Sequence, residues 1–179
     1  MMKLNLGSGE NIKSGFVNLD YKKYKGVDIV HDMTKFPYPF KDNTFNYIEA
    51  IDVLEHISHV YLVDIFNELY RILKEGGQLY IKSPLDYTEV VSLDPTHIKG
   101  LTPLLIKNCI GASKMYKENK SKGRIPYMNV KSKFRIKKMT VSPPFVSHLN
   151  FPYWFYSFNS IINNTFCSLK CILIKDGKV

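Results

Sequence analysis

The chain has 179 residues, of which 45% are hydrophobic and 23% are charged, and its formal net charge is +9 at pH 7. This length and composition suit one folded domain with a full core, and they exclude a disordered chain or two domains of ordinary size. No apolar run approaches the roughly 18 residues of a membrane span, and three cysteines without a signal peptide indicate free thiols, so we expect a soluble cytoplasmic protein.

The positive charge is concentrated in the C-terminal part. Residues 1–110 carry 12 Lys/Arg and 14 Asp/Glu, whereas residues 111–179 carry 13 and 2. Such asymmetry can mark a surface for nucleic acid or for an anionic substrate. Because 22 of the 25 basic residues are Lys, an A/T-rich genome would produce the same composition, and both interpretations stay open.

Five short strands are predicted in the first half of the chain. They are Met2–Leu6, Phe16–Asp20, Val27–His31, Phe45–Ala50 and Gln78–Lys82. Most alternate between apolar and polar residues, whereas a parallel sheet covered on both faces gives continuous apolar runs. We therefore expect a mostly parallel sheet with helices mainly on one face.

The connection between the first two strands is unusually short. Only nine residues, Gly7 to Gly15, separate them, where a crossover with a helix needs about ten to twelve. Gly7-Ser8-Gly9 follows its strand directly, as a cofactor loop does. The third glycine of G-x-G-x-x-G is replaced by Ile12. Because a pyrophosphate site uses that glycine and a long helix N-terminus, the loop favours a nucleoside without phosphate.

Acidic residues end the next two predicted strands. Asp20 is placed to accept both hydroxyls of a ribose, and Asp32 to accept the exocyclic amine of an adenine, with Met33 against the ring. The alternative is that these acids are turn residues at the strand ends. For Asp32 the ligand-binding and the turn interpretation are equally supported. Since the carboxyl ends of parallel strands meet at one edge of a sheet, these residues are predicted to line one crevice.

Two helices are predicted around the fifth strand. Residues 58–74 show an apolar stripe at helical spacing, with Ser58 as the N-cap and a glycine pair after Glu75 as the stop. Thr102 and Pro103 indicate the start of a short helix that runs to about residue 112.

The C-terminal third is predicted to add antiparallel structure to the sheet. Residues 114–133 are basic and without a good period, so we expect a loop. Residues 134–141 resemble an edge strand, and residues 169–174 a last strand. Residues 151–162 are aromatic and helix-compatible; we expect them to pack the core, with an acceptor wall, a stacking platform or a membrane-surface patch as alternatives.

The ordered motifs LNLGSG…GFVNLD…GVDIVHDM…FNYIEAIDVLEH…LYRILKEGGQLYI…DPTHIKGLT resemble the class I S-adenosylmethionine-dependent methyltransferases. The resemblance covers about residues 2–100 and is closest to compact members with short early loops, often of unknown substrate. It implies an α/β, Rossmann-like, mostly parallel sheet with C-terminal antiparallel strands. It also implies one methyltransferase domain over 1–179, with a cofactor-binding core in 1–100 and a basic, aromatic-rich part in 101–179.

The resemblance further implies S-adenosylmethionine as cofactor, whose lack of phosphate fits the short first loop. The implied cofactor-binding residues are Gly7, Ser8, Gly9, Asp20, Asp32, Met33, Ala50, Ile51 and Asp52. The glycine loop would pass the methionine part, Asp20 would bind the ribose, and Asp32 with Met33 would bracket the adenine. Residues 50–52 would lie beneath the sulfonium, which Asp52 could help to neutralise. Asn5 departs from the family, many members of which carry an acid there.

His56 and His97 are the candidate catalytic residues. A histidine near its ordinary pKa of about 6.5 suits proton acceptance or hydrogen bonding. A structural role is at least as well supported for His56, whereas His97 lies in a polar DPTH cluster on a loop. His56 and His59 could pair on a metal ion, but no third ligand follows at useful spacing, so no metal site is predicted.

The predicted function is methyl transfer to a small molecule or glycan, because the basic region is not a recognisable nucleic-acid module. An RNA or DNA methyltransferase that places Lys114–Lys138 on the phosphates is the alternative among enzymes. A non-catalytic binding protein with a vestigial cofactor crevice is the alternative from another class.

Overall fold

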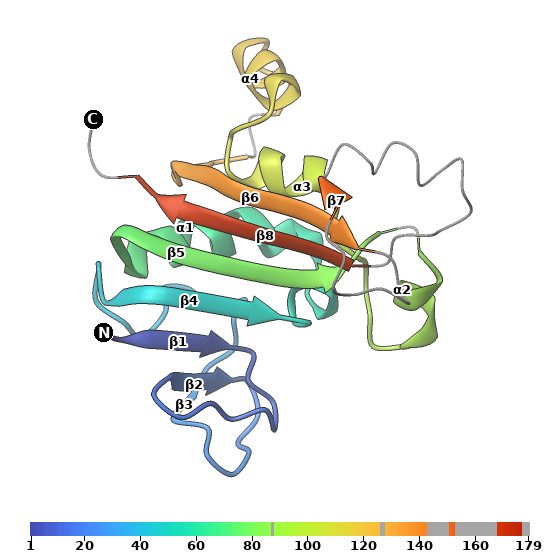
Figure 1. Cartoon of the computed structure of the whole chain (residues 1–179). Helices are drawn as coiled ribbons and strands as arrows, with labels where there is room; N and C mark the ends of the chain where they lie inside the picture. The colour runs from blue at the N-terminus through green and yellow to red at the C-terminus, as the bar shows by residue number, and fades with distance from the viewer. Residues whose placement is uncertain (87, 126–127, 143–150, 153–167, 177–179) are drawn as a thin grey trace.

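The computed structural model describes residues 1–86, 88–125, 128–142, 151–152 and 168–176. Its centre is one sheet of eight strands in the order β3-β2-β1-β4-β5-β8-β6-β7 (Figure 1). The neighbours from β3 to β5 pair in parallel, and the last three strands join antiparallel. This confirms the predicted α/β, Rossmann-like, mostly parallel sheet with C-terminal antiparallel strands.

Seven of the eight strands match the expected segments in order and in type, and the eighth falls at residues 151–152, where a helix-compatible segment was expected. The strands are β1 (Lys3–Leu6), β2 (Val17–Asp20), β3 (Ile29–Val30), β4 (Phe45–Ile51), β5 (Leu73–Pro84), β6 (Phe134–Ser142), β7 (Phe151–Pro152) and β8 (Ser168–Lys175). One placement differs from the prediction. The expected edge strand β6 lies between β8 and β7, although β7 pairs only with Thr140 and Val141.

Few helices accompany the sheet. The described helices are the 3-10 turns η1 (Leu54–His56) and η2 (His59–Tyr61), and the α-helices α1 (Leu62–Ile72), α2 (Glu89–Leu93), α3 (Pro103–Cys109) and α4 (Lys114–Ser121). Helices α1 and α3 lie on the same face of the sheet (Figure 1), as expected from the alternating strands. None of the helices within the described part of the chain is long and apolar enough to cross a membrane.

Helix α1 carries the apolar stripe that fixes it to the sheet. Its buried residues are Leu62, Ile65, Phe66, Leu69 and Ile72. The helix is shorter than the predicted 58–74, because residues 59–61 form a 3-10 turn and Leu73 already has the extended backbone of β5. The Ser58 side chain caps neither helix by a hydrogen bond, so that predicted cap is wrong.

Two helix starts further along the chain are set by hydroxyl caps. The Thr102 hydroxyl accepts a hydrogen bond from the Leu105 amide at 3.0 Å, which confirms the predicted start of α3. The Ser113 hydroxyl accepts from the Tyr116 amide at 2.8 Å and begins α4. The predicted loop over 114–133 is therefore wrong across residues 114–121. The expected aromatic helix at 151–162 lies outside the described residues, apart from β7.

Candidate functional site

A cavity of about 670 Å³ lies at the carboxyl ends of the first four strands, where open α/β sheets bind ligands. Six residues that the sequence predicts for a cofactor site line it: Gly7, Gly9, Asp20, Asp32, Met33 and Asp52. Of the other three, Ser8 and Ala50 are buried and Ile51 is partly buried, and none lines the cavity. The short connections after β1, β2 and β3 therefore converge on one place.

The glycine loop packs against the segment after β4. Gly7 has a φ of +67°, and a Cβ at this position would lie 2.1 Å from Cγ2 of Val53. Only glycine fits both the backbone and the space. Gly9 also has a positive φ, and its amide donates a 2.8 Å hydrogen bond to Oδ2 of Asp20. The loop and the acid at the end of β2 thus fix each other.

Asp20 is oriented by two backbone amides. Its Oδ2 accepts from Gly9, and its Oδ1 accepts from the amide of Lys22 at 2.9 Å. The residue is only 5% exposed, yet it lines the cavity. Each carboxylate oxygen has a second lone pair, so the two oxygens can still accept hydrogen bonds from two hydroxyls of a ligand.

Asp32 and Met33 follow β3 and form the next part of the wall. The amide and hydroxyl of Thr34 donate to Oδ1 of Asp32 at 2.9 and 2.8 Å. Both hydrogen bonds lower the pKa of Asp32 below its ordinary value, and the one from the backbone amide has the larger effect. The exposed carboxylate is therefore an acceptor at neutral pH. Met33 is buried, and its carbonyl accepts from the Tyr38 hydroxyl at 2.9 Å.

Asp52 ends β4 in an unusual conformation. Its φ is +51°, in the left-handed region that non-glycine residues seldom occupy. Its Oδ2 lies 2.6 Å from Nζ of Lys82 on β5. The acid expected near the sulfonium therefore already has a cationic partner.

Asn5, where many family members carry an acid, ties the short first loop to the sheet. Its Nδ2 donates to the carbonyl of Asn11 at 2.9 Å and to Oδ1 of Asn18 at 3.0 Å. Asn18 in turn accepts from the Lys13 amide. A carboxylate at position 5 has no hydrogen to donate when ionised. The amide is thus what holds a loop that lacks a helix.

Part of the cavity wall was missed from the sequence. The added residues are mostly aromatic or aliphatic: Tyr21, Tyr24, Val53, Ile57, Tyr61 and Ile98. Tyr21 and Tyr61 are exposed large side chains. Tyr21 could have been predicted from the sequence. It directly follows the acid at the end of β2, and a side chain next to a ribose-binding acid is expected to border the same ligand.

The two candidate histidines lie side by side. The rings of His56 and His97 have their centroids 4.7 Å apart. His56 lines the cavity, and its Nδ1 lies 3.1 Å from the carbonyl of Thr96. His97 stands beside it with Nδ1 3.2 Å from the carbonyl of Val91. The structure thus brings together residues from η1 and from the loop after α2.

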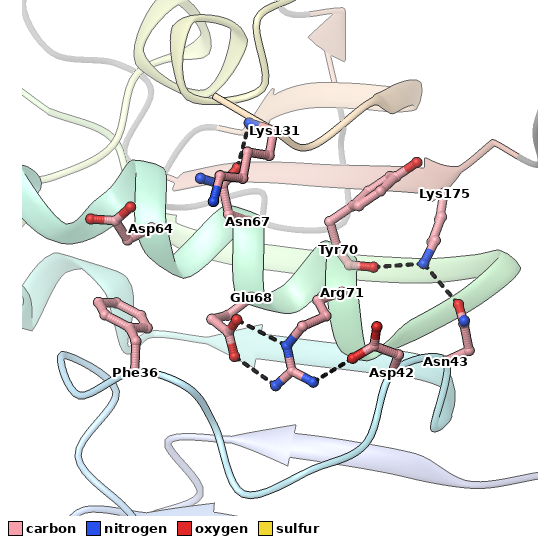
Figure 2. A pocket seen from close by; sticks show the side chains of 10 residues that line it. All are labelled: Phe36, Asp42, Asn43, Asp64, Asn67, Glu68, Tyr70, Arg71, Lys131 and Lys175. Carbon is pink, nitrogen blue, oxygen red and sulfur yellow. Dashed lines mark hydrogen bonds and ion pairs between the residues drawn. The ribbon is translucent and has the colours of Figure 1, made fainter. Parts of the chain in front are cut away.

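A second cavity, of about 500 Å³, lies along α1 (Figure 2). Several of its polar side chains already have partners within the protein. Arg71 donates to Glu68 at 2.7 and 2.9 Å and to Asp42 at 2.8 Å. Lys175 donates to Asn43 at 2.8 Å. Because none of the predicted site residues lines this cavity, the candidate site is the one at the strand ends.

Comparison with known proteins agrees with the fold and with the motifs. Residues 8–81 match the family model of a methyltransferase domain. An uncharacterised protein of Methanocaldococcus jannaschii is 46% identical over 43 residues, which are 24% of this chain and 18% of that protein. The match therefore spans less than a fifth of that curated relative.

Solved structures share the architecture at low sequence identity. An S-adenosylmethionine-dependent methyltransferase from Archaeoglobus fulgidus is 14% identical, with a TM-score of 0.57 over 97% of this chain and 86% of that one. Another from Methanosarcina mazei is 12% identical, with a TM-score of 0.58 over 99% and 93%. These likenesses show the fold, and the match of residues 8–81 to a methyltransferase domain agrees with the resemblance that the motifs indicated.

Proposed function

We propose that this chain, a member of the class I S-adenosylmethionine-dependent methyltransferases, transfers the methyl group of S-adenosylmethionine to a small-molecule or glycan acceptor. The observation that carries the proposal is the convergence on one cavity of the glycine loop, Asp20, Asp32 and Met33. These are the groups that a nucleoside without phosphate needs: bare backbone, an oriented carboxylate for the ribose, and an acid with an apolar neighbour for the base.

Each part of the cofactor has a proposed partner. The carboxylate of Asp20 accepts the two ribose hydroxyls with the lone pairs that its backbone donors leave free. Asp32 accepts from the adenine amine, and Met33 contacts the ring. The backbone of Gly7 and Gly9 borders the methionine part.

The sulfonium end is proposed to lie near residues 50–52, at the end of β4. Methyl transfer is an in-line displacement in which the acceptor's lone pair attacks the methyl carbon. The bond from carbon to sulfur breaks, its electron pair stays on sulfur, and the acceptor loses its proton. Positioning supplies much of the rate of such a reaction. Because His56 borders the same cavity, we place the activation of the acceptor at the pair of His56 and His97.

The shape of the site supports a small or sugar-like acceptor. The cavity wall offers the faces of Tyr21, Tyr24 and Tyr61, which provide large apolar contact with a polar edge. The lysine-rich α4 lies beyond β6, at the far edge of the sheet from β1, β2 and β3 (Figure 1). A nucleic acid held by α4 would therefore have to cross the width of the sheet to reach the cavity.

Calorimetric titration of S-adenosylhomocysteine tests the cofactor site. We expect a micromolar Kd, about −8 kcal/mol, for the wild type. Asp20→Asn removes the negative charge and one of the two oxygens that accept from the ribose, and it should weaken binding at least about tenfold, because a charged hydrogen bond contributes roughly 1.5–3 kcal/mol. Asp64→Asn, on the exposed side of α1, is the matched control and should bind as the wild type does. Absence of binding to the folded wild type, with NAD also inert, would overturn the enzyme proposal.

A further inference from the structure

Three potential metal ligands meet at the histidine pair. One carboxylate oxygen of Glu55 and one ring nitrogen each of His56 and His97 lie within 4.8 Å of one another. The amides of Ile98 and Lys99 donate to the carbonyl of Glu55 at 2.8 and 3.2 Å. The loop that carries His97 is thus fastened by its backbone to the turn that carries the other two residues.

The carboxylate of Glu55 is buried, and only one of its two oxygens accepts a hydrogen bond from a described residue. The residue is 0% exposed, and its Oε2 accepts from the Ser83 hydroxyl at 3.0 Å. No residue in the described part of the chain donates a hydrogen bond to its Oε1. An unsatisfied carboxylate oxygen costs free energy, which a bound cation would offset.

The contacts of the two histidines are compatible with metal binding through Nε2. A backbone carbonyl can only accept a hydrogen bond. The Nδ1 atoms of His56 and His97 lie 3.1 and 3.2 Å from the carbonyls of Thr96 and Val91, so each ring can donate from Nδ1. That tautomer leaves the lone pair of each ring on Nε2. Backbone carbonyls orient metal-binding histidines in this manner in many proteins.

We propose that Glu55, His56 and His97 bind one divalent transition-metal ion, which holds an oxygen of the methyl acceptor at the edge of the cavity. Two imidazoles and one carboxylate suit Zn²⁺, Mn²⁺, Fe²⁺ or Co²⁺ rather than Mg²⁺ or Ca²⁺, which prefer oxygen ligands. Bonds of about 2.0–2.2 Å require the three ligand atoms to approach by roughly 0.5–1 Å. Three protein ligands leave coordination positions open, and His56 borders the cavity.

The bound metal ion would activate the methyl acceptor for the proposed methyl transfer. This role of the site rests on the proposed function. A metal ion lowers the pKa of a bound hydroxyl. The acceptor's oxygen–hydrogen bond breaks, and the proton leaves to water. The oxygen then forms its bond to the methyl carbon while the carbon–sulfur bond breaks, and the metal ion keeps its oxidation state.

The positions of the three ligands along the chain explain why the sequence did not predict this metal site. The sequence pairs His56 with His59 and gives Glu55 no role, whereas the fold brings His97 from the loop after α2 to Glu55 and His56. His59 points to a different partner, with Nε2 3.2 Å from the carbonyl of Lys99. It is a partly buried histidine outside the cluster, and His59→Ala is therefore the matched control.

The test is calorimetric titration of ZnCl₂ and CoCl₂ into the metal-free full-length protein, with S-adenosylhomocysteine titrated into the same samples. The wild type should bind about one ion with a Kd in the micromolar range or tighter. His97→Ala and the isosteric Glu55→Gln should each weaken the metal ion at least about tenfold, since even indirect partners of metal ligands contribute 10- to 100-fold. His59→Ala should change the metal Kd by less than about threefold.

The paired titrations separate the two proposals. If the wild type binds S-adenosylhomocysteine but neither metal ion below about 100 μM, the metal site is wrong and the cofactor site stands. Equal metal affinity in wild type and His97→Ala also overturns the metal site. If the metal ion binds as expected and S-adenosylhomocysteine does not, the metal site stands and the proposed function fails.

Discussion

Gly7 shows how one residue without a side chain can set the shape of the site. Its φ of +67° is costly for other residues, and a Cβ would collide with Val53 at 2.1 Å. Gly123 has a similar φ of +65° but open space around the position of a Cβ. Substitutions at the two glycines therefore distinguish the free-energy cost of backbone strain from that of the collision with Val53.

We predict that Gly7→Ala lowers the free energy of unfolding by about 2–5 kcal/mol, from backbone strain of about 1–2 and overpacking of about 1–3. Gly123→Ala should cost only about 1–2 kcal/mol, because only the backbone cost applies. Urea denaturation of both variants measures the difference. Equal losses would show that the loop does not pack against Val53 as described.

Asn5 gives a prediction that runs against the family pattern. Asn5→Asp restores the acid that many members carry, but the carboxylate cannot donate to Asn11 and Asn18. We expect it to lower the free energy of unfolding by about 1–3 kcal/mol at pH 7, because two hydrogen bonds of the buried Asn5 side chain are lost and a carboxylate is placed against Oδ1 of Asn18. Chemical denaturation checks this, and a variant as stable as the wild type would contradict the role given to the amide.

At the scale of elements, α1 is fastened to the connection between β3 and β4 through Glu68 (Figure 2). Glu68 accepts from the Tyr38 amide at 2.8 Å and from Arg71 at 2.7 and 2.9 Å. Burial raises the pKa of Glu68, but these hydrogen bonds outweigh it and leave the pKa below its ordinary value. The carboxylate form is thus favoured by the folded state.

A group whose pKa is lowered on folding stabilises the protein above its unfolded pKa, here about 4.5, and that stabilisation is lost as the pH falls through the folded value. We predict that Glu68→Gln lowers the free energy of unfolding by about 1–3 kcal/mol at pH 7 and by much less at pH 3. Urea titrations at the two pH values, with Asp64→Asn as control, test it. A loss independent of pH would assign the effect to packing instead.

The elements that could be predicted are those with a local cause. Alternation gave the strands, and the Thr102 cap gave α3. The Ser113 cap of α4 was equally local, but the polar composition of residues 114–121 concealed it. The position of β8 between β5 and β6 depends on pairing between residues far apart in the chain, which one sequence does not reveal.

At the scale of the whole molecule, the parallel half of the sheet carries the candidate site, whereas the excess positive charge belongs to residues 111–179, which include α4 and the last antiparallel strands. The predicted residues that line the strand-end cavity could be found from the sequence because each lies at or just beyond the end of a strand, and the strand ends share one edge. The cluster of Glu55, His56 and His97 could not, because His97 reaches it through backbone hydrogen bonds of the loop after α2.

This separation predicts that charge on α4 has little effect at the cavity. Exchanging Lys117 and Lys122 for Glu should change the affinity for S-adenosylhomocysteine by less than about twofold, since exposed charges beyond about 10 Å are screened at 0.1 M salt. Calorimetry at that salt concentration measures it. A loss of tenfold or more would mean that α4 contributes to the cofactor site.

The most direct measurement is a crystal structure of the protein with S-adenosylhomocysteine. The account predicts the ribose hydroxyls within hydrogen-bonding distance of the Asp20 carboxylate, the adenine against Met33, and the sulfur near the end of β4. A ligand bound in the cavity along α1, or in the strand-end cavity without a contact to Asp20, would contradict the assignment of the site.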